Sequence, residues 1–234
     1  MKNYNKEAII LCIGLIIMGA CIADGLTSAF QSDRIVTVKG LSEREVPADK
    51  VTWPLVYKEL GNEPAEMYNR LATKNRQVID FLKEKGISEN EISESAIQVS
   101  DRQADSYDQN NILYRYKATS VITVTSSQVE LIRKIMQSQS ELMKMGIALI
   151  TEEYGTNTVK YEFTGLNEIK PDMIEESTKN ARATAEEFAK DSDSKLGKIR
   201  KASQGQFSID NRDANTPYIK RIRVVSTIEY YIED

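Results

Sequence analysis

Three stretches of this chain alternate apolar and polar side chains with a period of two, at residues 51–57, 112–124 and 218–230. Successive side chains of a strand point to opposite faces of the sheet, so each stretch predicts a strand with one buried face. The last predicted strand, about fourteen residues long, exceeds the usual five or six. The side chains predicted to be buried are Val51, Trp53, Leu55, Tyr57, Ile112, Tyr114, Tyr116, Ala118, Ile122, Val124, Tyr218, Ile222, Val224, Ile228 and Tyr230.

Three helices are predicted beside these strands, at residues 64–86, 128–145 and 170–195. Pro64 suits the first turn of the first helix and Gly86 its end. We expect further strands near residues 94–101, 147–154 and 158–164. The side chains predicted to face the core are Tyr68, Leu71, Val78 and Leu82 in the first helix, with Asn75 interrupting their stripe; Val129, Ile132, Met136 and Met143 in the second; and Ile174, Thr178, Ala181, Ala185 and Phe188 in the third.

The predicted fold class is therefore α+β, with a mixed or antiparallel sheet of long strands packed by about three helices and preceded by one N-terminal transmembrane helix. The small residues of the third helix predict a close approach to a sheet or to another helix. Pro54 has no N–H to donate and predicts a sheet edge or a bulge. We divide the chain into an N-terminal anchor and linker, residues 1–30, and one domain, residues 31–234.

The transmembrane prediction rests on residues 8–23, an uncharged apolar run slightly shorter than the usual span of about 20 residues. Lys2 and Lys6 precede the run and no basic residue follows until Arg34. The positive-inside rule then places the N-terminus in the cytoplasm and the domain outside the inner membrane.

Two alternatives to a single-pass anchor stay open. Residues 19–21 or 22–24 could serve as the small-residue cleavage site of a signal peptide. Residues 18–21, Met-Gly-Ala-Cys, resemble a degenerate bacterial lipobox, which would make the chain a lipoprotein lipidated at Cys21.

The residue counts remove most familiar catalytic sites. The chain has no histidine, and its two cysteines, Cys12 and Cys21, both lie in the N-terminal apolar run. The commonest general base and metal ligand is therefore missing, and the domain has no thiol. With 31 basic and 35 acidic residues there is no basic excess to attract nucleic acid. We expect no catalytic residues, metal site or cofactor.

The remaining motifs favour structural interpretations. Residues 192–195, Ser-Asp-Ser-Lys, match the spacing of a serine–lysine nucleophile pair but stand at the end of a polar helix. Asn211, Asp213 and Asn215 alternate like the start of a calcium loop, without its glycine or final glutamate. The acid pairs at 152–153, 175–176 and 186–187 predict solvated faces, and the cations at 220, 221 and 223 predict an exposed strand face or a contact surface.

Residues 35–53, IVTVKGLSEREVPADKVTW, could form either a functional site or a purely structural element. Glu43, Glu45 and Asp49 crowd beside Gly40 and a proline, which indicates either a working site or the construction of a first hairpin. The turn chemistry of residues 47–49 favours construction, with the acids on the surface. Gly40 would let the backbone bend or approach a neighbour closely.

The same stretch resembles the opening of the SIMPL domain, a Val-x-Val-x-Gly strand followed by a polar stretch and a second strand. The resemblance continues through FLKEKGISENEIS, YRYKATSVITVT and NARATAEEFAKDSDSKLGKI, and covers residues 35–232. It implies an exported envelope protein of unknown biochemical function, with no established active site and a tendency to form ring-like homo-oligomers. Some relatives are linked to oxidative stress.

Together these features predict a membrane-tethered periplasmic protein that acts by homo-oligomerisation or by binding an envelope protein, without catalysis. The long strands offer edges on which a partner strand can pair. The alternative is a small-ligand binder or an enzyme whose site uses Asp, Lys, Ser or Tyr, in a pocket between the strands and the long helix.

Overall fold

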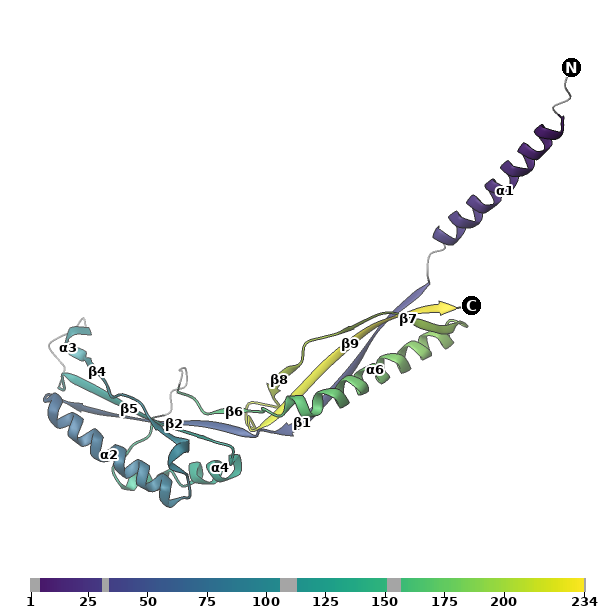
Figure 1. Ribbon diagram of the computed structural model, residues 1–234. Helices are drawn as coiled ribbons and strands as arrows, with labels where there is room; N and C mark the ends of the chain where they lie inside the picture. The colour runs from purple at the N-terminus through teal and green to yellow at the C-terminus, as the bar shows by residue number, and fades with distance from the viewer. Residues whose placement is uncertain (1–4, 31–33, 106–112, 151–156, 234) are drawn as a thin grey trace. The chain divides into compact units, whose positions relative to one another are not determined.

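The computed structural model describes residues 5–30, 34–105, 113–150 and 157–233 of the chain (Figure 1). Beyond the N-terminal helix, these residues form two compact units, each assembled from separate segments. Unit 1 contains residues up to 41, 175–205 and those from 225 onward, and unit 2 contains residues 42–174 and 206–224. Strands β1 (Ile35–Pro47) and β9 (Ile219–Glu233) and helix α6 (Leu166–Asp191) each contribute residues to both units.

Unit 2 is built on a five-stranded antiparallel sheet. Its long centre is β2 (Lys50–Gly61) paired with β5 (Tyr116–Ser126), from Val51 opposite Ser126 to Gly61 opposite Tyr116. The short strands β3 (Ile92–Glu94) and β4 (Gln98–Asp101) pair with β5, and β6 (Lys160–Glu162) pairs with β2. All pairings are antiparallel, as the alternating sequence pattern requires for a sheet with one buried face.

Helices α2 (Pro64–Glu84), α4 (Val129–Gln137) and α5 (Ser140–Lys144) supply the other half of this core. Two single turns lie beside the short strands: η1 (Glu89–Glu91) between α2 and β3, and α3 (Arg102–Asp105) directly after β4. The inward side chains predicted for residues 51–57 and 118–124 are confirmed. The buried side chains of this core include Val51, Trp53, Leu55, Tyr57, Leu71, Val78, Leu82, Ala118, Ile122, Val124, Ile132 and Leu142.

A second, smaller cluster in unit 2 joins the first turns of α6 to the beginning of β9. Met173, Ile222 and Val224 are fully buried there, and Phe163 and Leu166 pack against them. Strand β8 (Ser208–Asn211) pairs with β9 from Ser208 opposite Arg223 to Asn211 opposite Lys220.

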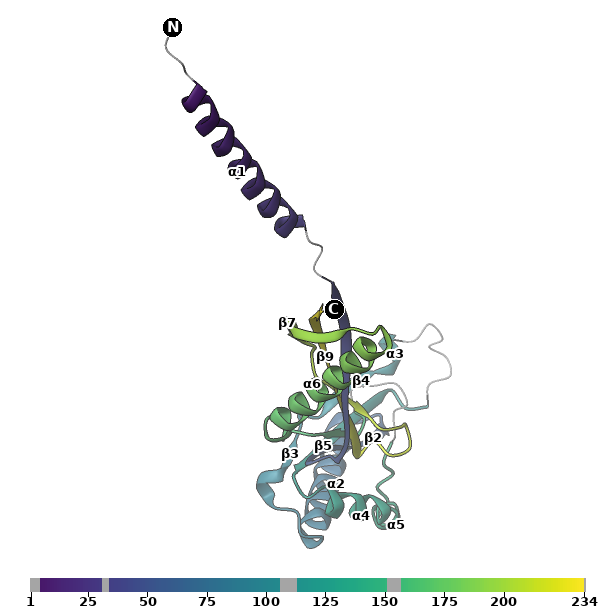
Figure 2. The same cartoon turned by 90° about the vertical axis from the view of Figure 1, so that its right-hand side faces the viewer.

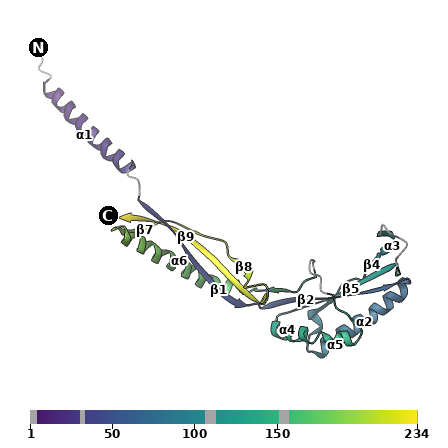
Figure 3. The same ribbon diagram turned by 180° about the vertical axis from the view of Figure 1, so that it is seen from behind.

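In unit 1 the strand order is β1-β9-β7, with β7 comprising Lys195–Gln204. Helix α6 runs along β9 and β1 (Figure 2), and its Ala181 and Ala185 pack on Val38, Ile228 and Tyr230. Strands β1 and β7 lie on opposite sides of β9 (Figure 3). The predicted close approach of a small-residue helix to a sheet is confirmed here.

The glycine at position 40 of β1 allows helix α6 to lie very close to this strand. A methyl group at Gly40 would overlap the backbone carbonyl oxygen of Ser177 and the backbone nitrogen of Ala181, and would lie 2.9 Å from the Ala181 Cβ. Two members of the predicted stripe, Ala181 and Ala185, are buried here together with Ser177 and Ala189, whereas Phe188, the predicted end of the stripe, is 56% exposed.

Several helix predictions are wrong in detail. The helix predicted at 128–145 is two helices, because α4 ends at Gln137 and α5 begins at Ser140. Leu142 rather than Met143 is buried in α5, and Met67 rather than Tyr68 in α2. Helix α6 begins at Leu166, four residues before the predicted start, so Pro171 lies inside it.

Several predicted strands also differ from the structure in their bounds or in their pairing. β5 begins at Tyr116, so Tyr114 is exposed, and Ile112 lies outside the described residues. Residues 95–97 separate β3 from β4, where one strand was predicted. Residues 147–150 are not a strand, and residues 151–154 lie outside the described part. The hairpin interpretation of residues 35–53 is wrong, because β1 and β2 belong to different sheets.

The N-terminal helix α1 (Asn5–Phe30) was predicted to span a membrane. Within the described residues, no helix combines the length and the apolarity that a membrane span requires, so the structure does not support that part of the predicted fold. The side chains of residues 10–23 of α1 are all exposed.

The Gly40 contact gives a first prediction. We expect Gly40→Ala to lower the free energy of unfolding by at least about 2 kcal/mol, because the added methyl meets helix backbone, which cannot rotate away. Lys39→Ala, an exposed substitution on the same strand, should change it by less than about 0.5 kcal/mol. Urea unfolding followed by circular dichroism measures both. Equal stability of the two variants would contradict the close packing of α6 on β1.

Candidate functional site

The serine–lysine motif at residues 192–195 ends a helix. The Ser192 hydroxyl donates to the carbonyl oxygens of Phe188 (2.9 Å) and Ala189 (3.0 Å). Asp193 takes a left-handed φ of 51°, and the Ser194 N–H donates back to the Ala189 carbonyl at 2.9 Å. Lys195 begins β7 opposite Glu233. The motif is a C-terminal helix cap.

The acidic loop between β8 and β9 is likewise a turn. The Asp213 carboxylate accepts the backbone N–H groups of Asn215 and Thr216, both at 2.8 Å, and hydrogen bonds from the Thr216 hydroxyl and the Arg212 guanidinium. The Thr216 and Arg212 contacts hold the pKa of Asp213 at about 2. Its lone pairs are taken by the protein, as in an Asx turn.

The three acids of the opening stretch have structural partners. Glu43 and Glu45 lie 3.5 Å and 3.9 Å from the guanidinium of Arg221, and Glu45 lies 3.6 Å from Arg212. Asp49 accepts the backbone N–H groups of Thr164 and Gly165 and so fixes the chain just before α6 begins. The interpretation of this stretch as construction is consistent with these contacts.

The predicted basic cluster is divided between the two faces of β9. Lys220 is 7% exposed, and its ammonium donates to the side-chain oxygen of Asn211. Burial lowers the pKa of Lys220. Arg221 pairs with the acids of β1, and Arg223 is exposed. These three cations do not form one surface.

The described members of the predicted acid pairs lie on α6, where Glu175 contacts Lys179 at 2.6 Å and Glu186 contacts Arg182 at 2.9 Å. The pair at 152–153 lies outside the described residues. In the described part of the chain, no group of three acidic, cysteine or histidine side chains is arranged to hold a metal ion.

A buried polar network was missed from the sequence. Asn75, 2% exposed, accepts hydrogen bonds from the hydroxyls of Tyr57 and Ser120 on its side-chain oxygen, and its amide nitrogen donates to Glu94. Burial raises the pKa of Tyr57 to about 12, so its hydroxyl stays protonated and can donate. The one sequence feature that pointed to this network is Asn75 itself, which interrupts an otherwise apolar stripe of the helix.

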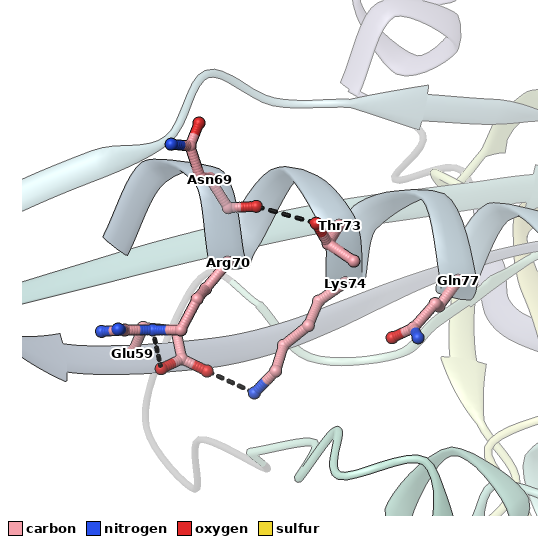
Figure 4. A pocket seen from close by; sticks show the side chains of 6 residues that line it. All are labelled: Glu59, Asn69, Arg70, Thr73, Lys74 and Gln77. Carbon is pink, nitrogen blue, oxygen red and sulfur yellow. Dashed lines mark hydrogen bonds and ion pairs between the residues drawn. The ribbon is translucent and has the colours of Figure 1, made fainter. Parts of the chain in front are cut away.

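Beside this network lies an open polar groove of about 500 Å³ between α2 and β2 (Figure 4). Glu59 forms its floor, with a side chain only 15% exposed, and pairs with Lys74 and, at 3.6 Å, with Arg70. The remaining lining residues are Asn69, Thr73 and Gln77. The groove has cations and amides to hold a polar ligand, but its one carboxylate is already neutralised by two cations.

The open edge of β1 is the second candidate, and two backbone hydrogen bonds fix its orientation. The Ile232 N–H donates to the Arg34 carbonyl, and the Ala48 N–H donates to the Tyr218 carbonyl, both at 2.8 Å. In an antiparallel ladder the N–H and C=O groups of alternate residues point to the same neighbour. The even-numbered residues of β1 therefore face β9, and the odd-numbered ones face away from it.

The contact of Asn180 agrees with this alternation. Its side-chain amide donates to the Leu41 carbonyl at 2.8 Å, on the side of β1 away from β9. The main-chain groups of Ile35, Thr37 and Lys39 point to that same side, and among the described residues no strand pairs with β1 there. Their side chains are exposed, whereas Val38 and Gly40 are buried. The Leu41 carbonyl is occupied by Asn180, so the edge that can accept another strand runs from Ile35 to Lys39.

Comparison with known proteins gives one family. The family SIMPL, described as a protein of unknown function (DUF541), matches residues 36–226. No curated protein matches the chain. The match begins in β1 and ends in β9, so it takes in residues of both units.

The Asn75 network predicts a specific loss of stability. We expect Asn75→Ala to lower the free energy of unfolding by about 2–3 kcal/mol, because the buried hydroxyls of Tyr57 and Ser120 lose their hydrogen-bond acceptor. Asn69→Ala, on the exposed face of the same helix, should cost less than about 0.5 kcal/mol.

Tyr57→Phe provides the check. This substitution should lower the free energy of unfolding less in the Asn75→Ala background than in the parent chain, because there it removes a buried hydroxyl that has no acceptor. Additive losses in this double-mutant cycle, measured by urea unfolding, would mean that Asn75 and Tyr57 do not act together.

Proposed function

The chain belongs to the SIMPL family, and from that premise we propose that it is an exported envelope protein whose folded part works by self-association rather than by catalysis. The observation that carries the proposal is the open edge of β1, from Ile35 to Lys39, which no described strand covers. A second copy supplies a strand that pairs with this edge, and the N-terminal segment holds the chain at the inner membrane with its folded part in the periplasm.

The edge has the properties that strand addition needs. Its free N–H and C=O groups belong to Ile35, Thr37 and Lys39, at alternate positions, which matches the spacing of an added antiparallel strand. Proteins often block such edges with several charges, a bulge or a proline. Between residues 35 and 41 the only charged side chain is Lys39, and there is no proline.

Two kinds of assembly follow from the strand order in unit 1. Pairing of β1 with the β1 of a second copy would close a symmetric dimer. Pairing of β1 with β7, the opposite edge of the same sheet, would continue the sheet from copy to copy, giving a ring if the rotation between copies closes and a filament if it does not. The particle mass distinguishes the two.

Membrane attachment is supported by the exposed apolar side chains of α1. Ile10, Leu11 and Ile16 are 70%, 67% and 71% exposed, and further apolar residues are exposed as far as Ile22. Exposed apolar residues on every side of a helix favour an apolar environment rather than one packed face. Lipidation at Cys21, which is exposed, would achieve the same attachment.

A small-ligand binder is the second candidate, and the groove in Figure 4 favours it. Arg70 approaches the Leu60 carbonyl at 3.4 Å and Glu59 and Glu66 at 3.6 Å and 3.8 Å, so its guanidinium makes only long contacts. It can turn toward an anionic group of a ligand. A compound that stabilises the protein against heat, and fails to do so in Arg70→Gln, would identify this function.

Proline substitution at the edge tests self-association. Thr37→Pro removes an N–H that points away from β9, so we expect the fold to persist, while pairing with another copy is lost. Thr37→Ala keeps that N–H and should assemble like the parent chain. Light scattering of the detergent-solubilised protein over a range of concentrations measures the mass of each.

The proposal expects a parent particle heavier than one chain, unchanged in Thr37→Ala and reduced to the monomer in Thr37→Pro. Circular dichroism confirms that each variant is folded, and Lys39→Pro repeats the test two residues away. A parent that stays monomeric at every concentration, or a folded Thr37→Pro that still assembles, would overturn the proposal.

A further inference from the structure

Strand β7 carries the densest basic stretch of unit 1. Its first seven residues, KLGKIRK, contain Lys195, Lys198, Arg200 and Lys201 and no acid. All four cationic side chains are exposed. Strand β7 pairs with β9 on one side only within the described residues. Four cations on one exposed edge strand indicate a surface for an anionic partner.

The charge of this strand is only partly compensated. Glu229 and Glu233 of β9 stand opposite Lys201 and Lys195 in the ladder, and Arg200 contacts Glu229 at 3.2 Å. Two register shifts, on either side of Ile199, interrupt the regular alternation of the strand. Such bulges redirect side chains, and here they lie within the basic stretch.

Two apolar residues of this strand, Leu196 and Ile199, stand opposite Ile232 and Tyr230, on the other face of the strand from Lys195 and Lys201. A groove of about 380 Å³ lies between α6 and β7, and its lining combines the apolar Leu196, Ile199 and Tyr230 with Lys198 and the ion pair of Arg182 and Glu186. Ile199 is 53% exposed. Cations mixed with exposed apolar groups suit a membrane interface, where the headgroup region meets acyl chains.

If the N-terminal segment is held in a membrane, the short chain between this segment and β1 sets an upper limit on the distance from the membrane to β7. The apolar run ends at residue 23, so the seven further residues of α1 up to Phe30 add about 10 Å. The step from Phe30 to Arg34 adds at most about 14 Å. The Arg34 carbonyl accepts the Ile232 N–H, and Ile232 stands opposite Leu196 of β7. Two strand spacings, roughly 10 Å, therefore separate Arg34 from the start of β7.

We propose that β7 docks unit 1 onto the anionic lipid headgroups of the membrane, through Lys195, Lys198, Arg200 and Lys201, with Ile199 entering the interface. The proposal rests on the membrane attachment proposed above for the N-terminal segment. Headgroup contacts use the side chains of β7, so they leave the β1 edge available for a second copy. Docking of this kind holds the folded part against the bilayer.

Hydrogen exchange of the full chain on vesicles tests the proposal. Zwitterionic phosphatidylcholine vesicles are compared with vesicles that contain about 30 mol % phosphatidylglycerol, whose negative surface attracts basic segments. We expect the amides of residues 195–204 to exchange severalfold more slowly on the anionic vesicles. High salt should remove the difference, because it screens exposed charges.

Two matched variants locate the effect. Lys198→Gln, Arg200→Gln and Lys201→Gln together should abolish the slower exchange. Lys134→Gln, Lys144→Gln and Lys160→Gln together remove the same charge from exposed positions of unit 2 and should keep it. Equal exchange on both vesicle types, or the same behaviour of both triple variants, would overturn the docking surface.

Flotation with phosphatidylcholine vesicles at high salt separates this proposal from the attachment on which it rests. A chain that floats there but shows no effect of anionic lipid retains its N-terminal attachment and lacks the β7 contact. A chain that does not float with those vesicles contradicts the attachment itself.

Discussion

The fold of unit 1 depends on the contact between Gly40 of β1 and the backbone of α6 at Ser177 and Ala181. Because no side chain separates strand and helix there, the small residues of α6 lie directly on the sheet, and Val38 is sealed between them. The contact determines which face of β1 is buried. With that face buried, the main-chain groups of alternate β1 residues point away from β9. These groups form the edge on which the proposed function rests.

Much of this could be predicted from the sequence, because the relevant signals are local. Alternation identified the inward residues of β2 and β9, since a strand with one buried face repeats every two residues. Gly40 and the small residues of α6 indicated a close approach, although the partner of each was not known. Pro64 and Gly86 marked the ends of α2, where proline is tolerated and where Gly86 adopts a positive φ of 95°.

The remaining features depend on contacts between distant residues. Nothing local shows that β1 pairs with β9 instead of β2, or that Asp49 binds the backbone before a helix more than a hundred residues later. Asn75 looked like an interruption of a helix stripe, because its partners Tyr57 and Ser120 come from two different strands. The open edge of β1 is likewise a property of the strand order, which the sequence pattern does not contain.

Amide exchange resolved to single residues of β1 tests the central claim most directly, because it reads the edge itself. At low protein concentration the amides of Thr37 and Lys39 should exchange much faster than those of Val38 and Gly40, which face β9. At high concentration Thr37 and Lys39 should become protected, as they pair with the strand of a second copy. Fast exchange of both amides at every concentration, in particles shown to contain several copies, would contradict assembly through β1.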